Sequence, residues 1–301
     1  RRKPPDMDFI AFAAIHGLDI RRLDHGKITR CPTKDHPRKD NGAYLFDGQW
    51  GWVQDWATML EPVYWTDETI TKPEDLAALR ARMEASRKQH AQERARDAQA
   101  AAKRAQAIVA AAAPEPHAYL DSKGWRDTGL VWYPSEGVNL LVIPMRIDGA
   151  LAGCQLIDRD GNKKFLKGQR TNGAEYVFGA RGVDVWCEGY ATARSISECL
   201  ALAGLPARVH ACFSAGNLQR MAKTGVVVAD HDASQTGENA AQATGLPYYL
   251  PEIEGEDFND EWRRLGTFAA GMKLRQWLQK ARNGARPEPG AQETRAARAQ
   301  P

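Results

Sequence analysis

Five carboxylates follow short apolar runs in the second half of the chain: Glu188, Asp230, Asp232, Asp257 and Asp260. The runs have the length of buried strands: Val183–Cys187, Gly225–Ala229 and Pro247–Leu250. In a parallel sheet their carboxyl ends meet at one edge, where such sheets bind ligands. Gly189 permits a sharp turn after Glu188, and the spacing of two lets Asp230 and Asp232 lie on one side of an extended segment. We therefore expect an acidic cluster.

Clustered carboxylates repel one another and raise each other's pKa unless a hard cation lies among them. Oxygen ligands in an open site suit Mg²⁺ or Mn²⁺, and two such ions suit phosphoryl transfer. The alternative for each acid is a helix cap or a turn residue. Capping alone would explain Asp232, which precedes Ala-Ser-Gln-Thr-Gly.

The surrounding segments alternate between strand and helix patterns. Helices are predicted between the strands and after them, over Ala191–Ala203, Asn217–Ala222, Gly237–Thr244 and Phe268–Ala281, with a further strand at Ala207–Phe213. This alternation implies right-handed crossovers and a parallel sheet, hence an α/β fold. The Pro/Gly/Ala/Arg-rich tail, Asn283–Pro301, is expected to be disordered.

A basic β-meander is predicted upstream of the acids. Its strands are Leu140–Met145, Ala150–Ile157 and Lys164–Leu166, divided by Asp-Gly turns. Six basic residues lie on it within residues 146–170: Arg146, Arg159, Lys163, Lys164, Lys167 and Arg170. Because this positive charge is local, it forms a candidate phosphate-facing patch.

The first 65 residues predict a small β-rich module. A helix is expected over Asp8–His16, with strand-like pieces at Gly26–Cys31, Ala43–Phe46 and Trp50–Asp55. The tryptophans Trp50, Trp52 and Trp56 could stack on unpaired bases, and core packing is the alternative for them. From Pro73 to Ala113 the sequence predicts a long solvated spacer helix, packed only at its start and near Ile108 and Val109.

Composition sets the broad class of the protein. With 301 residues, 43% hydrophobic and 26% charged, the chain is long enough for about two domains, and its net charge is only +3. No apolar stretch reaches membrane-spanning length and no signal-peptide core follows the N-terminus, so we expect a cytoplasmic protein without a membrane partner. Five scattered cysteines without a CxxC pair argue against disulfides and a zinc ribbon.

The acidic segments resemble a known family. Trp186–Ala193 resembles the Glu-Gly motif of Toprim domains, and Val228–Asp232 followed by Gly237 resembles their Asp-x-Asp motif. Asp257–Asp260 is similar to the third acidic motif of phage and plasmid Toprim primases. Leu141–Gly168 resembles the basic subdomain that precedes Toprim in bacterial primases. The stretch from Pro116 to Leu120, followed by Lys123 and Gly124, is also similar to phage-type primases.

The resemblance implies a Toprim-domain DNA primase of phage or plasmid type, acting in the bacterial or phage-infected cell. It would make short RNA primers on single-stranded DNA from ribonucleoside triphosphates. Glu188 would act as general base or metal-shell acid, while Asp230, Asp232 and Asp257 would hold Mg²⁺ or Mn²⁺, with Asp260 the least certain ligand. The basic patch would hold template and triphosphate. No GxxxxGK[ST] loop occurs in the chain, so a replicative helicase would be a separate partner or lie outside this sequence.

The expected organisation has five parts: a degenerate zinc-ribbon-like, template-binding module (1–72), the spacer (73–113), a basic subdomain (114–180), a Rossmann-like Toprim domain (181–282) and the tail (283–301). Zinc is not expected, because His25, Cys31 and His36 make a poor tetrahedral site; Cys31 would be a core thiol. Two other functions stay open. One is a Toprim-type metal-dependent nuclease, and the other is a non-catalytic single-strand-binding accessory protein.

Overall fold

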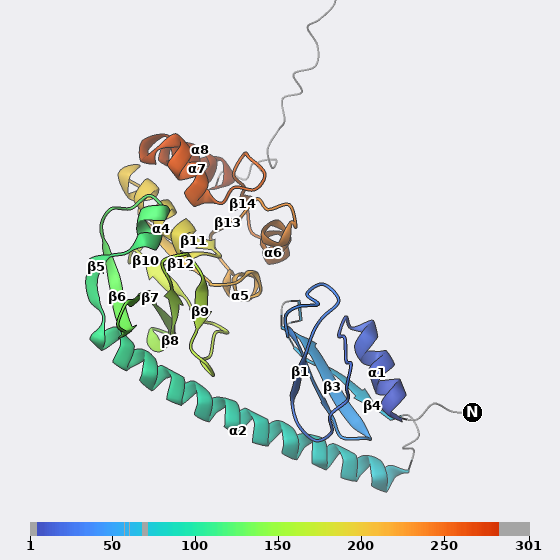
Figure 1. Ribbon diagram of the computed structural model, residues 1–301. Helices are drawn as coiled ribbons and strands as arrows, with labels where there is room; N and C mark the ends of the chain where they lie inside the picture. Colours follow the sequence, from blue (N-terminus) through green and yellow to red (C-terminus); the bar gives the residue numbers. More distant parts are fainter. Residues whose placement is uncertain (1–4, 57, 60, 68–71, 283–301) are drawn as a thin grey trace, which may run out of the picture. The chain divides into compact units, whose positions relative to one another are not determined.

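The structure is a computed structural model that describes residues 5–56, 58–59, 61–67 and 72–282. The chain has two compact units, Arg1–Arg94 and Ala95–Pro301 (Figure 1). Helix α2 (Pro73–Ala111) contributes to both units. None of the described helices is long and apolar enough to cross a membrane. The tail 283–301, expected to be disordered, lies outside the described residues.

The first unit is the β-rich module that the sequence predicts. Its antiparallel sheet runs in chain order, with strands β1 (Thr29–Cys31), β2 (Gly42–Phe46), β3 (Trp50–Asp55) and β4 (Val63–Thr66). Helix α1 (Pro5–Ile15) packs on one face through Phe9, which stacks on Phe46 with ring centroids 4.6 Å apart. Cys31 lies in the same core, as predicted. Strand β4 was not predicted.

The structure corrects the stacking hypothesis for Trp50 and Trp52. Their side chains are only 2% and 9% exposed and pack with Leu45 and with Leu79 of α2. The indole nitrogen of Trp50 donates a hydrogen bond to Asp47 at 2.9 Å. Rings covered in this way have no free face for a base, so the core alternative is the one observed. Trp56, in contrast, is 54% exposed.

Helix α2 ends two residues before the predicted boundary. Most of its described side chains are exposed, whereas Leu79 near its start and Ala105 and Ile108 near its end are buried. Ala105 and Ile108 pack against Val142 and Cys154 of the following sheet. The predicted pattern, a solvated helix packed at its two ends, is confirmed. Its mostly polar composition offers no apolar stripe for the middle of the helix to bury.

The second unit begins with a five-stranded antiparallel sheet in chain order. Its strands are β5 (Ala113–Pro116), β6 (Thr128–Ser135), β7 (Val138–Ile147), β8 (Ala150–Ile157) and β9 (Lys163–Phe165). The three predicted strands of the meander are present, and β5 and β6 are additional. The prolines at 114 and 116 hide β5 from sequence analysis. An edge strand tolerates them because its outer amides need no partner.

The second sheet of this unit has the order β10-β12-β11-β13-β14. The strands are β10 (Tyr176–Phe178), β11 (Val183–Cys187), β12 (Ala207–Ala211), β13 (Val226–Val228) and β14 (Tyr248–Tyr249). All pairs are parallel except that of β10 with β12. The predicted parallel sheet is therefore confirmed. The chain passes from β11 to β12 on one side of β11, and then crosses from β12 to β13 on the other side of β11. The strand order therefore reverses direction between β11 and β13, and such a point is called a switch point.

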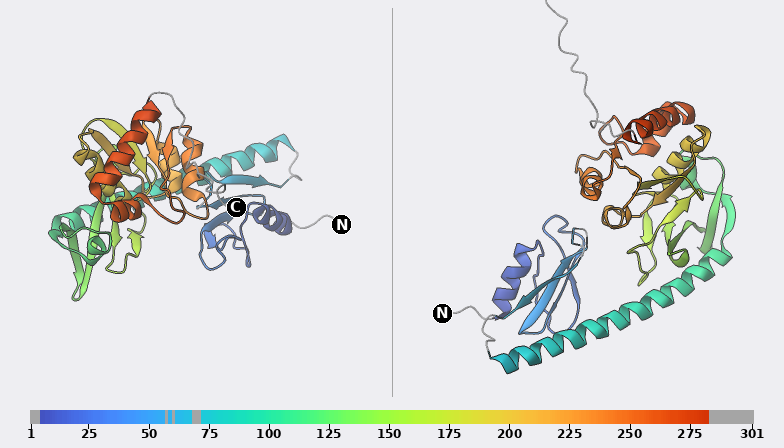
Figure 2. Two further views of the ribbon diagram at one scale, coloured as in Figure 1. Left: turned by 90° about the horizontal axis from the view of Figure 1, so that it is seen from above. Right: turned by 180° about the vertical axis from the view of Figure 1, so that it is seen from behind.

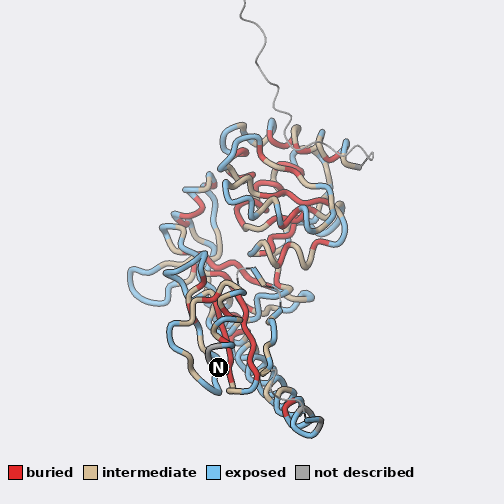
Figure 3. Tube along the Cα trace, turned by 90° about the vertical axis from the view of Figure 1, so that its right-hand side faces the viewer, coloured by how far each residue is buried: buried red, intermediate tan, exposed pale blue. Residues whose placement is uncertain are grey.

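Helices cover both faces of the parallel sheet (Figures 1 and 2). Helices α4 (Tyr190–Leu202), α7 (Phe258–Leu265) and α8 (Thr267–Arg282) share one core, and α5 (Ala215–Met221) and α6 (Thr236–Thr244) share the other. Side chains along β11 alternate between the two faces of the sheet, so Val185 and Cys187 pack in the first core and Trp186 packs in the second. Buried strands between exposed helix surfaces are visible in Figure 3. Helix α7 was not predicted.

One hydrophobic core joins the two sheets of the second unit. Leu120 of the short helix α3 (Ala118–Ser122) and Leu141 and Ile143 of β7 pack in the same cluster as Val185 of β11. The backbones of Arg146 and Glu175 also pair. The antiparallel sheet is thus held against the parallel one within this unit. The boundaries expected at 113/114 and 180/181 stay predictions.

Candidate active site at the ends of the parallel strands

Glu188 directly follows β11. Its carboxylate makes no hydrogen bond with any described residue, and burial raises its pKa, with Lys163 opposing and Asp232 adding to the rise. Gly189 caps α4 at φ −100°, a conformation open to any residue, so the predicted glycine-dependent turn is not found. A Cβ there would meet only the Thr192 hydroxyl, at 3.6 Å. The structure therefore gives no steric reason for glycine at this position.

Asp230 lies beyond the end of β13, on the other side of the switch point. Its Oδ1 atom is buried and has no hydrogen-bond partner among the described residues. Burial, together with repulsion from Asp257, Glu188 and Asp232, raises the pKa of Asp230 to about 7, and Lys163 opposes this rise. A buried carboxylate oxygen without a donor is costly, so the arrangement favours a ligand that supplies positive charge there.

Gly237 lets helix α6 approach Asp230 closely. A Cβ on Gly237 would lie 2.7 Å from the carbonyl oxygen and 3.1 Å from the amide nitrogen of Asp230. No larger residue fits without moving one of the two backbones. The glycine that follows the Asp-x-Asp segment is therefore required by packing.

Asp232 serves the loop that enters α6. Its carboxylate accepts hydrogen bonds from the Ser234 hydroxyl and from the amides of Thr236 and Gly237, at 3.3 and 3.4 Å for the amides. Burial acts against the charged form, but these hydrogen bonds prevail and hold the pKa of Asp232 below its ordinary value. The capping role considered from the sequence is thus present. It does not use all the lone pairs of the carboxylate.

Asp257 and Asp260 form a capping box at the start of α7. Asp257 accepts a hydrogen bond from the Asp260 amide at 2.9 Å, and Asp260 accepts one from the Asp257 amide at 3.4 Å. The ammonium group of Lys123 lies 3.8 Å from the other oxygen of Asp257. Asp257 acts electrostatically on Asp230, whereas Asp260 is turned back onto its own helix. The five acids therefore differ in what they already bind.

Among the six predicted basic residues, Lys163 is the one that the structure associates with the acids. Its charge acts on both Glu188 and Asp230. Lys164, the next residue of β9, has the opposite side-chain direction and acts on Asp158 in the preceding turn. The remaining four are exposed on strands and turns of the same unit: Arg146, Arg159, Lys167 and Arg170.

Two residues near the acids received no role from sequence analysis. The Tyr119 hydroxyl is buried without a hydrogen-bond partner, and its ring centroid lies 6.0 Å from the Lys163 ammonium. Burial and the charge of Asp257 raise the pKa of this hydroxyl. Lys123 is the second, and Asn259 fixes its carbonyl with a 3.0 Å hydrogen bond. Both belong to the Tyr-Leu to Lys-Gly stretch that resembles phage-type primases, which was the available signal.

The donor set fits a hard divalent cation. Among the described residues no three His, Cys, Asp or Glu side chains are drawn together tightly enough to hold an ion as they stand. The two acids at the switch point nevertheless offer carboxylate oxygens without partners, which suit Mg²⁺ or Mn²⁺.

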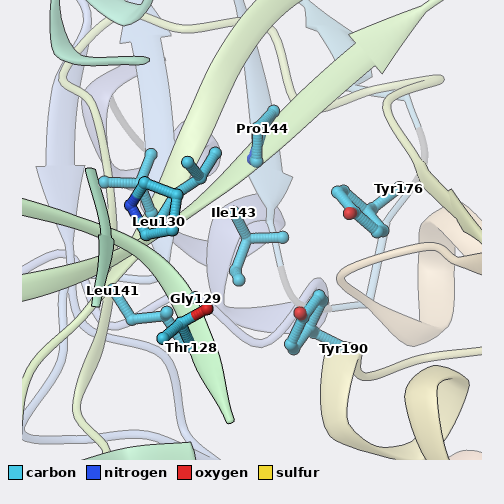
Figure 4. A pocket seen from close by; sticks show the side chains of 10 residues that line it. Thr128, Gly129, Leu130, Leu141, Ile143, Pro144, Tyr176 and Tyr190 are labelled. Atoms are coloured by element: carbon cyan, nitrogen blue, oxygen red, sulfur yellow. The ribbon is translucent and has the colours of Figure 1, made fainter. Parts of the chain in front are cut away.

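A pocket of about 250 Å³, lined mainly by uncharged side chains, lies elsewhere in the second unit. In Figure 4, Tyr176 and Tyr190 face Ile143 across it, with Leu130 and Leu141 beyond. None of the predicted site residues lines this pocket. Since its lining contains no charged side chain, it offers no counter-charge to a phosphate.

Two proteins named DNA primases are similar to part of this chain. No family model matches the chain. A protein named DNA primase TraC from Escherichia coli is 28% identical over 299 residues, covering 82% of this chain and 27% of that protein. A second Escherichia coli protein of the same name is 28% identical over 202 residues, covering 52% of this chain and 14% of its own length. The chain thus spans about a quarter or less of these relatives, and the similarity supports a primase-like relationship.

Proposed function

We propose that this chain is a Toprim-type primase region that synthesises short RNA primers on single-stranded DNA by metal-dependent nucleotidyl transfer. The observation that carries the proposal is the pair Glu188 and Asp230, two partly buried carboxylates without hydrogen-bond partners, on either side of the switch point of a parallel sheet. The similarity to proteins named DNA primases supports the choice of reaction.

Glu188, Asp230 and Asp232 would hold Mg²⁺ or Mn²⁺, with Asp257 at the margin of the site. When bound, such an ion neutralises phosphate charge and promotes attack by a hydroxyl group. Asp260 contributes less, because its charge, unlike those of Glu188, Asp232 and Asp257, does not act on Asp230. In the alternative role, with Asp230 and Asp232 holding the ion, Glu188 would accept the proton of the primer 3′ hydroxyl, since burial raises its pKa above that of an exposed carboxylate.

The basic residues near the acids and those on the exposed meander would bind different parts of the substrates. Lys163, beside Glu188 and Asp230, would hold the triphosphate and offset its charge. The exposed basic side chains of the meander would track the backbone of the single-stranded template: Arg146, Arg159, Lys164, Lys167 and Arg170. A replicative helicase would be a further partner of the primase.

A primer-synthesis assay tests the proposal. The full chain is incubated with single-stranded DNA of mixed sequence, labelled ribonucleotides and Mg²⁺ or Mn²⁺, beside Glu188→Gln and Asp230→Asn. Short labelled oligomers that disappear in both variants and in excess chelator are expected. Glu198→Gln, on the exposed side of α4, is the matched control and should keep the activity.

Two results would replace the proposal. Metal-dependent shortening of the DNA without any labelled product would establish a nuclease. If the DNA is neither extended nor shortened, each variant is titrated with Mn²⁺ alone to test for a metal site. Equal DNA binding by all variants, without a Mn²⁺ site that Asp230→Asn removes, would establish a non-catalytic single-strand-binding protein.

A further inference from the structure

Two phenylalanine rings lie next to the acidic edge of the parallel sheet. Phe165 on β9 is 43% exposed, and Phe213 follows β12 and is partly exposed. The rings meet edge to face, with centroids 6.4 Å apart and planes at 86°. They come from different sheets of the second unit. Phe213 also packs against the core that α4, α7 and α8 share, whereas Phe165 keeps much of its surface open beside it.

The backbone places Phe213 directly beside Glu188. The amide of Phe213 donates a 2.7 Å hydrogen bond to the carbonyl oxygen of Glu188. Phe213 has φ +67°, a left-handed conformation that is rare for a bulky side chain. Ser214 then caps α5 by accepting a hydrogen bond from Asn217. The strained residue is thus held between the end of β12 and a capped helix, in a place where strain often accompanies function.

The short strand β9 supplies a cation and a ring on one face. Lys163 and Phe165 are two residues apart, so their side chains leave the strand in the same direction. Lys163 acts on Glu188 and Asp230, and Phe165 meets Phe213. The positive charge for phosphate and the apolar surface for a base therefore lie side by side.

We propose that Phe165 and Phe213 form a nucleobase-stacking platform that positions a nucleotide against the acidic site, with its phosphates toward Lys163. The inference rests on the proposed function and names a binding element within that site. Stacking suits a primase because every base has an aromatic face, so the platform accepts any base. The base belongs either to the incoming ribonucleotide or to the template strand.

Binding measurements on the full chain distinguish the two sources. The affinities of Phe165→Ala and of the unmodified chain are measured for two pairs of ligands. The first pair is a ribonucleoside triphosphate and inorganic triphosphate. The second pair is a single-stranded oligonucleotide and the same strand with abasic sites. Phe165→Trp is the conservative variant. Phe268→Ala, which removes a 70% exposed phenylalanine from α8, is the matched control.

In one of the two ligand pairs, Phe165→Ala is expected to bind the ligand that contains a base about tenfold more weakly than the unmodified chain does. Its affinity for the ligand without a base should not change. Phe165→Trp should restore binding, and Phe268→Ala should bind as the unmodified chain does. Loss with the triphosphates identifies the incoming nucleotide, and loss with the oligonucleotides identifies the template.

Equal affinities of Phe165→Ala and the unmodified chain in both ligand pairs would overturn the platform and leave primer synthesis untouched. An equal loss for baseless ligands would overturn it too, because the ring would then act only on the fold. Base-dependent binding by a chain that makes no primers would keep the platform and reject the proposed reaction. Absence of base-dependent binding in the unmodified chain would reject the platform.

Discussion

The acids at the ends of β11 and β13 differ from those at the starts of α6 and α7. Glu188 and Asp230 are partly buried without hydrogen-bond partners, and their pKa values are raised. Asp232 and Asp257 accept hydrogen bonds from nearby amides that would otherwise lack partners. All are aspartate or glutamate after an apolar run. The difference teaches that such a pattern contains two populations, one that stabilises backbone and one that is available to a ligand.

The largest expected effect separates these populations directly. Asp230→Asn should lower metal-dependent activity on the order of 10³-fold, because it removes a preorganised charge from the site. The same substitution should not lower the free energy of unfolding, because the buried charge that it removes has no hydrogen-bond partner and is itself destabilising. Primer synthesis and urea denaturation at pH 7.5 measure the two quantities. A strongly destabilised Asp230→Asn would place Asp230 with the stabilising acids.

The pH dependence of stability should follow the same carboxylate. Unfolded aspartate titrates near pH 4, whereas Asp230 in the folded chain titrates at about 7. Between these values the folded state binds the extra proton, so the free energy of unfolding of the metal-free protein falls as pH rises from about 4 to about 7. Urea denaturation in chelator across this range measures it. Asp230→Asn should flatten the slope, and an unchanged slope would contradict the assignment.

Asp232 tests whether one residue can belong to both populations. Asp232→Asn keeps an oxygen at the Oδ1 position for the Ser234 hydroxyl and the Thr236 amide, but it loses the charge and the 3.4 Å hydrogen bond from the Gly237 amide to Oδ2. We expect magnesium dependence to weaken about tenfold while the melting temperature changes little. The measurement is activity against Mg²⁺ concentration, with Asp160→Asn in the exposed turn of the meander as control. A lower melting temperature with unchanged magnesium dependence would leave Asp232 with the capping role alone.

The smallest expected effect concerns the capping box of α7. Asp257→Ala should lower the free energy of unfolding by about 1 kcal/mol, the usual contribution of an N-cap. Asp260→Ala should have a smaller effect, because its return bond is 3.4 Å long. Urea denaturation of both variants provides the comparison. Equal stability of Asp257→Ala and the unmodified chain would show that Asp257 does not belong with the capping acids.

The predicted strands and helices around the acids match the structure closely because each has a strong local pattern. Val183–Cys187 and Trp50–Asp55 were bounded to the residue. The missed elements were missed for different reasons. Strand β5 contains two prolines, and its structure depends on an edge position beside β6. Helix α7 does have a helical pattern, with Phe258, Trp262 and Leu265 on one side, but it is only eight residues long and its Asp257 and Asp260 were interpreted as metal ligands instead of a capping box.

The same limit explains the aromatic residues. Trp50 and Trp52 alternate along β3 as an exposed stacking face could, but helix α2 covers them through Leu79. Phe165 was predicted as part of a strand and received no binding role from the sequence, yet it is 43% exposed and contacts Phe213 beside Glu188. Sequence alternation tells which side chains share a face. It does not tell what lies against that face.

The sequence by itself determined the alternation of strand and helix, the order of the acids along the chain and the local positive charge before them, because these follow from residue type and spacing. Only the tertiary structure decided which carboxylates are without donors, that Lys163 and not Lys164 faces them, and that Tyr119 and Phe213 lie at the same edge. The reason is physical: hydrogen bonds, burial and charge interactions join residues far apart in the chain, and their energies depend on distances that spacing does not contain.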